Sequence, residues 1–272
     1  MNDYKEKIEK LKWLKSIGID FYLSNSIIEQ TEDFLTKIKN ENELSEIQQV
    51  PNKIQTPNIL TKTTDTGQVA RARMLASKAK NLQELKAILE DFDGCELKQF
   101  AKNTVFADGI SSSKVMLIGE APGASEDEQG IPFCGQSGLL LDKMIESIDL
   151  SRTKNAYITN TVFWRPPANR RPTQEEIDIC RPFVEKHIAL VNPSLIILVG
   201  ATAATSLLGK HDGISNIRKN AYQYQNEYME KSVKMMSIFH PAYLLRQPMQ
   251  KKTTWFDLIG IKSYLRENKI IT

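Results

Sequence analysis

Short apolar runs alternate with longer amphipathic stretches from about residue 91 onward. The apolar runs predict buried strands at residues 115–118, 156–159, 195–199 and 234–239. Apolar positions at helical spacing predict helices at residues 138–148, 174–191, 201–208 and 254–267. Strands that alternate with helices form a parallel sheet covered on both faces. The predicted fold class is therefore α/β, with three layers (α/β/α) around a central four-stranded parallel sheet.

The N-terminal part of the chain has a different pattern. Helical spacing of apolar residues predicts a helix over residues 1–30, and residues 40–68 are polar and without periodicity, which is typical of a linker. A further helix is predicted over about residues 70–89. We therefore expect a helical N-terminal extension with a polar linker at residues 1–75, followed by one domain at residues 76–272.

The composition is that of a globular protein, with 41% hydrophobic and 25% charged residues. The sequence contains no apolar run of membrane-spanning length and begins with a charged segment, so we expect a cytoplasmic protein without a membrane partner. The net charge of +3 does not select a ligand class. The chain has three widely spaced cysteines, Cys95, Cys134 and Cys180. This spacing argues against a disulfide framework and against a zinc site.

Glycine or polar residues follow each of the four predicted strands. The turn 119–123 follows the first, Asn160 the second, Gly200 the third and His240 the fourth. Ligands of parallel α/β sheets bind beyond the carboxyl ends of the strands. The sequence therefore predicts one polar site at that edge of the sheet.

Two glycine-bounded turns belong to this edge. The N–H groups of the turn 119–123 can hold an anion or a carbonyl oxygen, although a plain strand-to-helix turn has the same pattern. The turn 132–138 opens a helix, whose N-terminus favours phosphate. Phe133 in that turn is placed either to stack on a planar ring or to cover the core. The amide of Asn160 suits the edge of a pyrimidine, and an Asx-turn is the alternative.

Two further segments carry candidate chemistry. The loop 165–172 holds three arginines between prolines and suits phosphate oxygens, or is simply solvated. In the segment HPAYLLR, a neutral His240 can donate to a developing oxyanion, and the two leucines that follow can fill the gap left by an extruded base. His187, on a long predicted helix, is expected to be structural.

Three segments in this order resemble the uracil-DNA glycosylase superfamily, and within it the family 4 type: GEAPGASEDEQGIPFCGQSGLLLDKM, YITNTVFWRPPANRRPTQEEI and HPAYLLR. Together with W-x-D-L at residues 255–258, the resemblance covers residues 95–260. It implies a DNA repair enzyme that flips uracil out of DNA and hydrolyses its N-glycosidic bond, leaving an abasic site for base excision repair.

The resemblance also implies roles for the matching residues. His240 would bond the uracil oxygen as the glycosidic bond breaks, and Asn160 would recognise the Watson–Crick edge. The implied substrate-binding residues are Gly119, Ala121, Pro122, Gly123, Phe133 and Asn160. The implied DNA-binding residues, of which Leu244 or Leu245 would enter the duplex, are Gly135, Ser137, Arg165, Arg170, Leu244, Leu245 and Arg246.

The sequence departs from the family pattern at two places. Ala121 stands where the best-known members of the superfamily carry an aspartate, which leaves Glu120 and Glu126 as alternatives for the group that activates water. Family 4 enzymes hold a [4Fe–4S] cluster on four cysteines, and the matching positions here are Phe92, Cys95, Trp164 and Cys180. We expect no cluster and no metal, with Cys95 and Cys180 as remnants of the ligand set and side chains filling the space.

Two other functions stay open at this level. A DNA-binding or lesion-sensing protein with weak catalysis would explain the missing aspartate and cysteines. A nucleotide-binding enzyme ranks lower, because the chain has no P-loop lysine. The expected partner is uracil-containing DNA, single- or double-stranded, and the N-terminal extension is a candidate docking segment for a protein partner.

Overall fold

The computed structural model describes residues 67–210 and 212–271. The chain divides into two compact units, residues 1–55 and 56–272, and all described residues belong to the second unit. The helix expected at residues 1–30 and most of the expected linker lie outside the described residues.

A six-stranded sheet with the order β1-β3-β2-β4-β6-β5 forms the centre of the unit. Its four inner strands run parallel and confirm the four predicted strands: β2 (Val115–Gly119), β3 (Tyr157–Asn160), β4 (Leu195–Val199) and β6 (Val233–Ile238). The sheet is mixed, however, because two short strands pair antiparallel at its edges: β1 (Asp108–Gly109) and β5 (Tyr222–Tyr224). These partly exposed edge strands have no continuous apolar run, so the hydrophobic pattern did not predict them.

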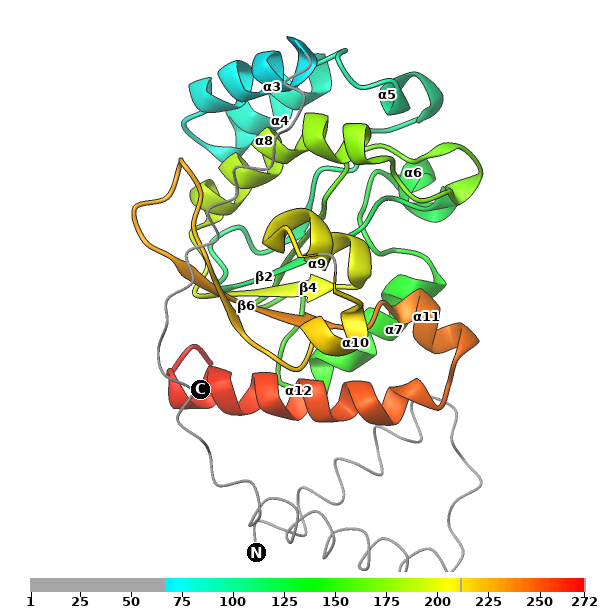
Figure 1. Ribbon diagram of the computed structural model, residues 1–272, viewed down its shortest axis with the longest axis vertical. Helices are drawn as coiled ribbons and strands as arrows, with labels where there is room; N and C mark the ends of the chain where they lie inside the picture. Colours follow the sequence, from blue (N-terminus) through cyan, green and yellow to red (C-terminus); the bar gives the residue numbers. More distant parts are fainter. Residues whose placement is uncertain (1–66, 211, 272) are drawn as a thin grey trace, which may run out of the picture. The chain divides into compact units, whose positions relative to one another are not determined.

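Helices cover both faces of the sheet, as Figure 1 shows. On one side lie α8 (Gln174–Val191) and α9 (Ala201–Leu208), and on the other α7 (Gln136–Glu146) and α12 (Gln250–Glu267). The predicted helices at these positions and the three-layer arrangement are therefore confirmed. The shorter helices, which the hydrophobic pattern did not predict, are α5 (Leu97–Phe100), α6 (Ala124–Gln129), η1 (Pro167–Asn169), α10 (Ile214–Ile217) and α11 (Pro241–Arg246).

The single helix expected at residues 70–89 is wrong, because the structure has two helices there. The first, α3 (Gly67–Lys78), and the second, α4 (Leu82–Asp91), both pack on α8. Asn81 separates them: its side-chain oxygen accepts from the N–H of Glu84 at 2.8 Å and so caps α4. Since α3 runs through residues 75 and 76, the domain boundary expected there falls within a helix, and the division itself stays a prediction.

The register of the sheet brings the carboxyl ends of the parallel strands together. Gly119 at the end of β2 lies opposite Asn160 at the end of β3. Val199 at the end of β4 lies opposite Ile238 in β6, and the N–H of Gly200 donates to the carbonyl of Ile238 at 2.9 Å. Every residue of β2, β3 and β4 is buried, so the residues that follow these strands are fixed to a rigid sheet.

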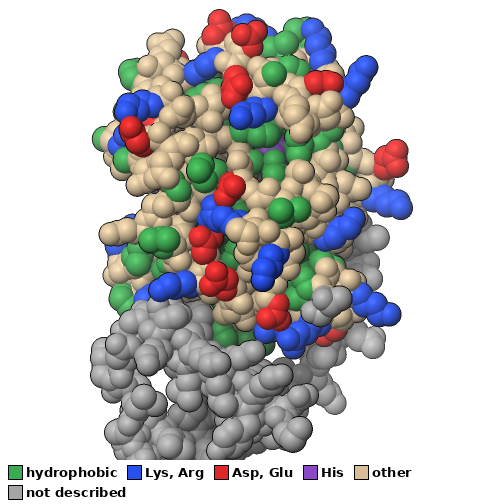
Figure 2. All heavy atoms as spheres, turned by 180° about the vertical axis from the view of Figure 1, so that it is seen from behind, with side chains coloured by type: hydrophobic (Ala, Val, Ile, Leu, Met, Phe, Trp, Pro, Cys, Tyr) green, Lys and Arg blue, Asp and Glu red, His purple; other side chains and the backbone are tan. Residues whose placement is uncertain are grey.

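Two surface properties bear on the partners of the chain. No helix in the described ranges has both the length and the apolar character needed to cross a membrane. On the face seen in Figure 2, basic and acidic side chains are interspersed rather than gathered into one basic patch. This distribution agrees with the small net charge of +3.

Candidate functional site

A cleft of about 740 Å³ lies at the predicted edge of the sheet and receives residues from the ends of all four parallel strands. Thirteen of the predicted site residues line it: Glu120, Ala121, Pro122, Gly123, Glu126, Phe133, Gly135, Ser137, Asn160, Arg170, His240, Leu245 and Arg246. Three predicted residues do not line it: Gly119, Arg165 and Leu244. The strand ends therefore meet in one cavity.

Gly119 lies behind the wall of the cleft and allows two larger side chains to approach the end of β2. A Cβ atom at this position would lie 2.4 Å from Asn160 Oδ1 and 2.4 Å from Phe133 Cζ. Asn160 is only 1% exposed, and its Oδ1 has no hydrogen-bond partner among the described residues. A buried amide oxygen without a partner is energetically costly, which marks Asn160 as a group able to bind a donor in the cleft.

Phe133 forms a wall of the cleft from a turn with unusual backbone geometry. Its φ of 53° lies in the left-handed region, which is uncommon for a residue with a side chain. Its ring is 5.8 Å from the His240 ring, with 33° between the two planes, and Phe133 as a whole is 6% exposed. Helix α7 packs so closely on this turn that a Cβ at Gly138 would lie 1.8 Å from the Phe133 carbonyl oxygen.

Glu126 joins the two glycine-bounded turns. Its Oε2 accepts from the N–H of Gly123 at 3.1 Å. Its Oε1 accepts from the N–H groups of Cys134 and Gly135 at 3.1 and 2.9 Å. Three backbone donors therefore occupy this carboxylate, and it holds the turns 119–123 and 132–138 in a fixed relation.

Glu120 has a different environment. Its Oε2 accepts from the hydroxyl of Thr202 at the start of α9. Its backbone carbonyl accepts from the Thr161 hydroxyl at 2.6 Å, which fixes the main chain. Glu120 lines the cleft, and among the described residues its carboxylate accepts from a hydroxyl and not from backbone N–H groups, unlike that of Glu126.

His240 caps helix α11, and this contact determines which ring nitrogen can donate. Nδ1 accepts from the N–H of Ala242 at 3.1 Å, so in the neutral ring the proton resides on Nε2. Burial, assisted by the charge of Arg246, lowers the pKa of His240 to about 4. The ring is therefore a neutral donor at neutral pH. Gly200 makes room for it, because a Cβ there would lie 2.9 Å from His240 Cβ.

The two leucines of α11 have opposite environments. Leu244 is fully buried, whereas Leu245 is 44% exposed and lines the cleft beside Arg246. Leu245 is therefore the leucine available to a bound molecule.

The arginine loop is partly committed to internal contacts. Arg165 donates to Asn169 Oδ1 at 2.7 Å, and Arg170 makes two hydrogen bonds to Glu176 at 2.9 and 2.6 Å. Arg171 also lines the cleft and is exposed, and its side chain makes no hydrogen bond or ion pair with the described residues.

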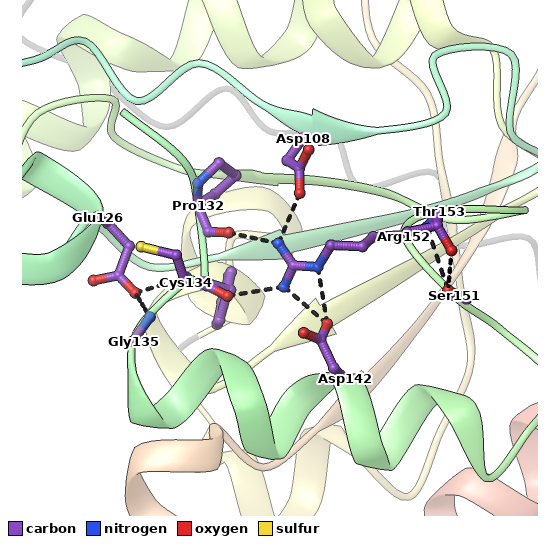
Figure 3. Close-up of polar contacts among 10 residues, drawn as sticks. Asp108, Glu126, Pro132, Cys134, Gly135, Asp142, Ser151, Arg152 and Thr153 are labelled. Carbon is purple, nitrogen blue, oxygen red and sulfur yellow. Dashed lines mark hydrogen bonds and ion pairs between the residues drawn. The ribbon is translucent and has the colours of Figure 1, made fainter. Parts of the chain in front are cut away.

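Sequence reasoning missed two side chains that support the site, Thr202 and Arg152. Arg152 donates to the carbonyls of Pro132 and Phe133 and pairs with two aspartates (Figure 3). Its aspartate partners are 44 and 10 residues away along the chain, so no local pattern could reveal the contact.

The four positions that match cluster ligands in the family are filled by packed side chains. Phe92 packs on Phe183 with ring centroids 5.1 Å apart, and Trp164 Nε1 donates to Thr104 at 2.9 Å. Cys95 and Cys180 are fully buried and hydrogen-bond each other, which raises the pKa of Cys180 well above its usual value. Two thiols and two aromatic side chains do not fit a four-thiolate cluster. No group of three or more metal-ligating side chains occurs within residues 67–210 and 212–271.

Comparison with known proteins agrees with the geometry of this edge. The family model described as "Uracil DNA glycosylase superfamily" matches residues 106–259. A Type-4 uracil-DNA glycosylase of Pyrobaculum aerophilum is 34% identical over 198 residues, which cover 70% of this chain and 100% of that protein.

Two other relatives give the same result. A Type-4 uracil-DNA glycosylase of Saccharolobus solfataricus is 36% identical over 65% of this chain and 82% of that protein. One of Sulfurisphaera tokodaii is 33% identical over 67% of this chain and 84% of that protein. The resemblance noted in the motifs is confirmed, and the chain belongs to the uracil-DNA glycosylase superfamily.

Proposed function

We propose that this protein is a uracil-DNA glycosylase, which flips uracil out of DNA and hydrolyses its N-glycosidic bond to leave an abasic site for base excision repair. The names of its relatives support the activity. The observation that carries the proposal is the buried Asn160, which lines the same cleft as Phe133 and His240 and whose Oδ1 has no hydrogen-bond partner among the described residues. A flat ring with polar edges is the ligand that such a set of side chains fits.

Asn160 and Phe133 supply base recognition. The N3–H of uracil would donate to Asn160 Oδ1, whereas N3 of cytosine has no hydrogen to donate. The Phe133 ring provides a face on which the flipped base stacks. These two contacts offset part of the few kcal/mol that extrusion of a nucleotide costs.

His240 stabilises the leaving base. As the C–N bond breaks, the bonding electrons pass to uracil, and negative charge develops on its oxygens. The Nε2–H of the neutral imidazole donates to one of them, and the ring is already held by the α11 cap. A fixed donor of this kind contributes on the order of 10²–10³-fold to the rate.

Glu120 is the better candidate for the group that orients the attacking water and faces the cationic sugar. The Thr202 hydroxyl donates to one of its oxygens, and Glu120 lines the cleft. The oxygens of Glu126 are taken by three backbone donors, so Glu126 acts by holding the turns.

The rim of the cleft supplies candidate contacts to the DNA backbone and stack. Leu245 and Arg246 belong to α11 and line the cleft. Gly135 and Ser137 lie at the N-terminus of α7 and line it as well. The charge of Arg170 is already paired with Glu176, and Leu244 would have to leave the core, so the proposal rests on Leu245 and Arg246. Three further expectations stay predictions. They are binding of single- or double-stranded DNA, a partner protein for the N-terminal extension, and a cytoplasmic location.

The test of the function is release of uracil from a uracil-containing oligonucleotide, followed by alkaline cleavage at the abasic site. We expect His240→Ala to lower the single-turnover rate by about 10²–10³-fold, because the donor to the leaving base is lost. Affinity for a uracil-free oligonucleotide should change by less than about twofold, since the imidazole donates only to the extruded base.

His240→Asn is the matched control. Asparagine is a good helix cap, so it keeps the contact with the α11 N-terminus but lacks the ring donor. It should be as slow as His240→Ala. Wild-type rates in His240→Asn would show that the histidine acts only as a cap, and an inactive wild-type protein would overturn the proposed function.

Substitutions of the two glutamates should have different effects on activity and on thermal stability. Glu120→Gln is expected to slow uracil release by about 10²-fold with little change in Tm, since it removes only the carboxylate that orients water. Glu126→Gln should lower Tm on the order of 5 °C, because three charge-assisted hydrogen bonds are weakened. If Glu126→Gln keeps its Tm and loses activity while Glu120→Gln stays active, the roles are reversed.

We also propose that the protein works without an iron–sulfur cluster. Protein purified without exposure to oxygen should be colourless, and iron analysis should find only background levels, because the region offers two thiols rather than four. A brown preparation with absorption in the visible and stoichiometric iron would refute this.

A further inference from the structure

The side chain of Arg152 uses its complete hydrogen-bonding capacity inside the protein. A guanidinium has five N–H donors. Nε and Nη2 donate to Asp142 Oδ1 at 2.9 and 2.8 Å, and Nη1 donates to Asp108 Oδ2 at 2.8 Å. The two remaining donors bind the carbonyls of Pro132 and Phe133 at 3.0 and 2.8 Å. Figure 3 shows the guanidinium between the two aspartates and the turn.

This arrangement leaves Arg152 without a role in binding phosphate. Its side chain is only 15% exposed, and two carboxylates face its single positive charge. DNA oxygens would have to displace partners that already satisfy every donor. Arg152 therefore differs from Arg246, which is exposed on the rim of the cleft.

The turn that Arg152 holds is the one that carries Phe133. Two successive carbonyls, of Pro132 and Phe133, point to the guanidinium. The next two N–H groups, of Cys134 and Gly135, point to the carboxylate of Glu126. Opposite charges thus orient four consecutive residues of the turn from two sides, which Figure 3 shows for its labelled members.

Such a clamp compensates for the strain in the turn. Phe133 has a φ of 53°, a left-handed conformation that is strained for a residue with a side chain and persists only where the surrounding structure holds it. If the guanidinium is lost, both carbonyls lose a charged donor and the turn is free to relax toward negative φ. The ring would then leave its position 5.8 Å from the His240 ring and close to Gly119.

We propose that Arg152 is a positioning residue of the base-binding pocket, which acts through the Phe133 turn and sets the stacking face for the flipped base. The proposal rests on the proposed function, since it assigns the Phe133 ring to a bound uracil. It adds a residue that lies outside the cleft lining and outside every motif that carries the family resemblance.

The experiment compares Arg152→Gln with Arg181→Gln in the full chain. Arg181 is a matched control, because it is 18% exposed and pairs with Glu185 on α8 at 2.9 Å, away from the cleft. We expect Arg152→Gln to weaken binding of free uracil and to slow uracil release from DNA, each by at least about tenfold. Affinity for a uracil-free oligonucleotide should stay within about twofold, and Arg181→Gln should match the wild type in all three.

A double-mutant cycle separates positioning from general loss of structure. In a Phe133→Ala background the ring is already gone, so Arg152→Gln should slow uracil release by less than about twofold further. If Arg152→Gln does not fold, Arg152→Lys keeps the charge between the aspartates with three donors for four acceptor atoms. It should then show the same selective loss of uracil binding.

The outcomes are distinguishable. A folded Arg152 variant that binds free uracil as the wild type does, or a loss that is the same with and without Phe133, overturns the proposal for Arg152. A wild-type protein that binds uracil but releases none from DNA overturns the proposed function and leaves the positioning role testable by uracil binding. A wild-type protein that does neither contradicts both.

Discussion

The close approach of Asn160 and Phe133 to Gly119 is the contact on which the geometry of the cleft depends. Parallel pairing of β2 and β3 places Gly119 opposite Asn160, and the lack of a Cβ lets both side chains meet the strand end. The result is a buried amide oxygen that has no hydrogen-bond partner in the part of the chain that the structure describes. An unsatisfied buried acceptor costs about 1–3 kcal/mol in the free protein, and a bound base with an N–H at the right place removes that cost. Under the proposed function, selectivity for uracil would follow from the same atom.

The rest of the site holds this contact in place. The Glu126 carboxylate accepts hydrogen bonds from the N–H groups of the Phe133 turn, and the Arg152 guanidinium donates to its carbonyls. Nδ1 of His240 accepts from the N–H of Ala242 at the start of α11, which leaves Nε2 for the proposed contact with the leaving base. Since the Phe133 turn and His240 are held by neighbours in the free protein, the proposed reaction would need little reorganisation of these groups.

The sequence predicted the features that depend on local pattern. Buried parallel strands appear as continuous apolar runs, so β2, β3, β4 and β6 and the edge where they end were found without the structure. Features that depend on contacts distant in sequence were not found. The pairing of Arg152 with Asp108 across 44 residues is one, and the hydroxyl of Thr202 on Glu120 across 82 residues is another.

The sequence also could not distinguish the environments of neighbouring residues of the same type. Leu244 and Leu245 are equivalent in a pattern, and only the short helix α11 turns one into the core and the other outward. Arg170 was expected to bind phosphate, and its bidentate pair with Glu176 at the start of α8 could not be seen without the fold of the loop.

The account is tested most directly by changing the one hydrogen atom that Asn160 is proposed to recognise. Single-turnover release should be compared for oligonucleotides that carry uracil and N3-methyluracil. We predict a loss on the order of 10⁴-fold for the methylated base in the wild type, because Oδ1 of Asn160 would face a methyl group in place of a donor. In Asn160→Ala this difference should shrink markedly. Release of both bases by the wild type at rates within about tenfold of each other would contradict the account.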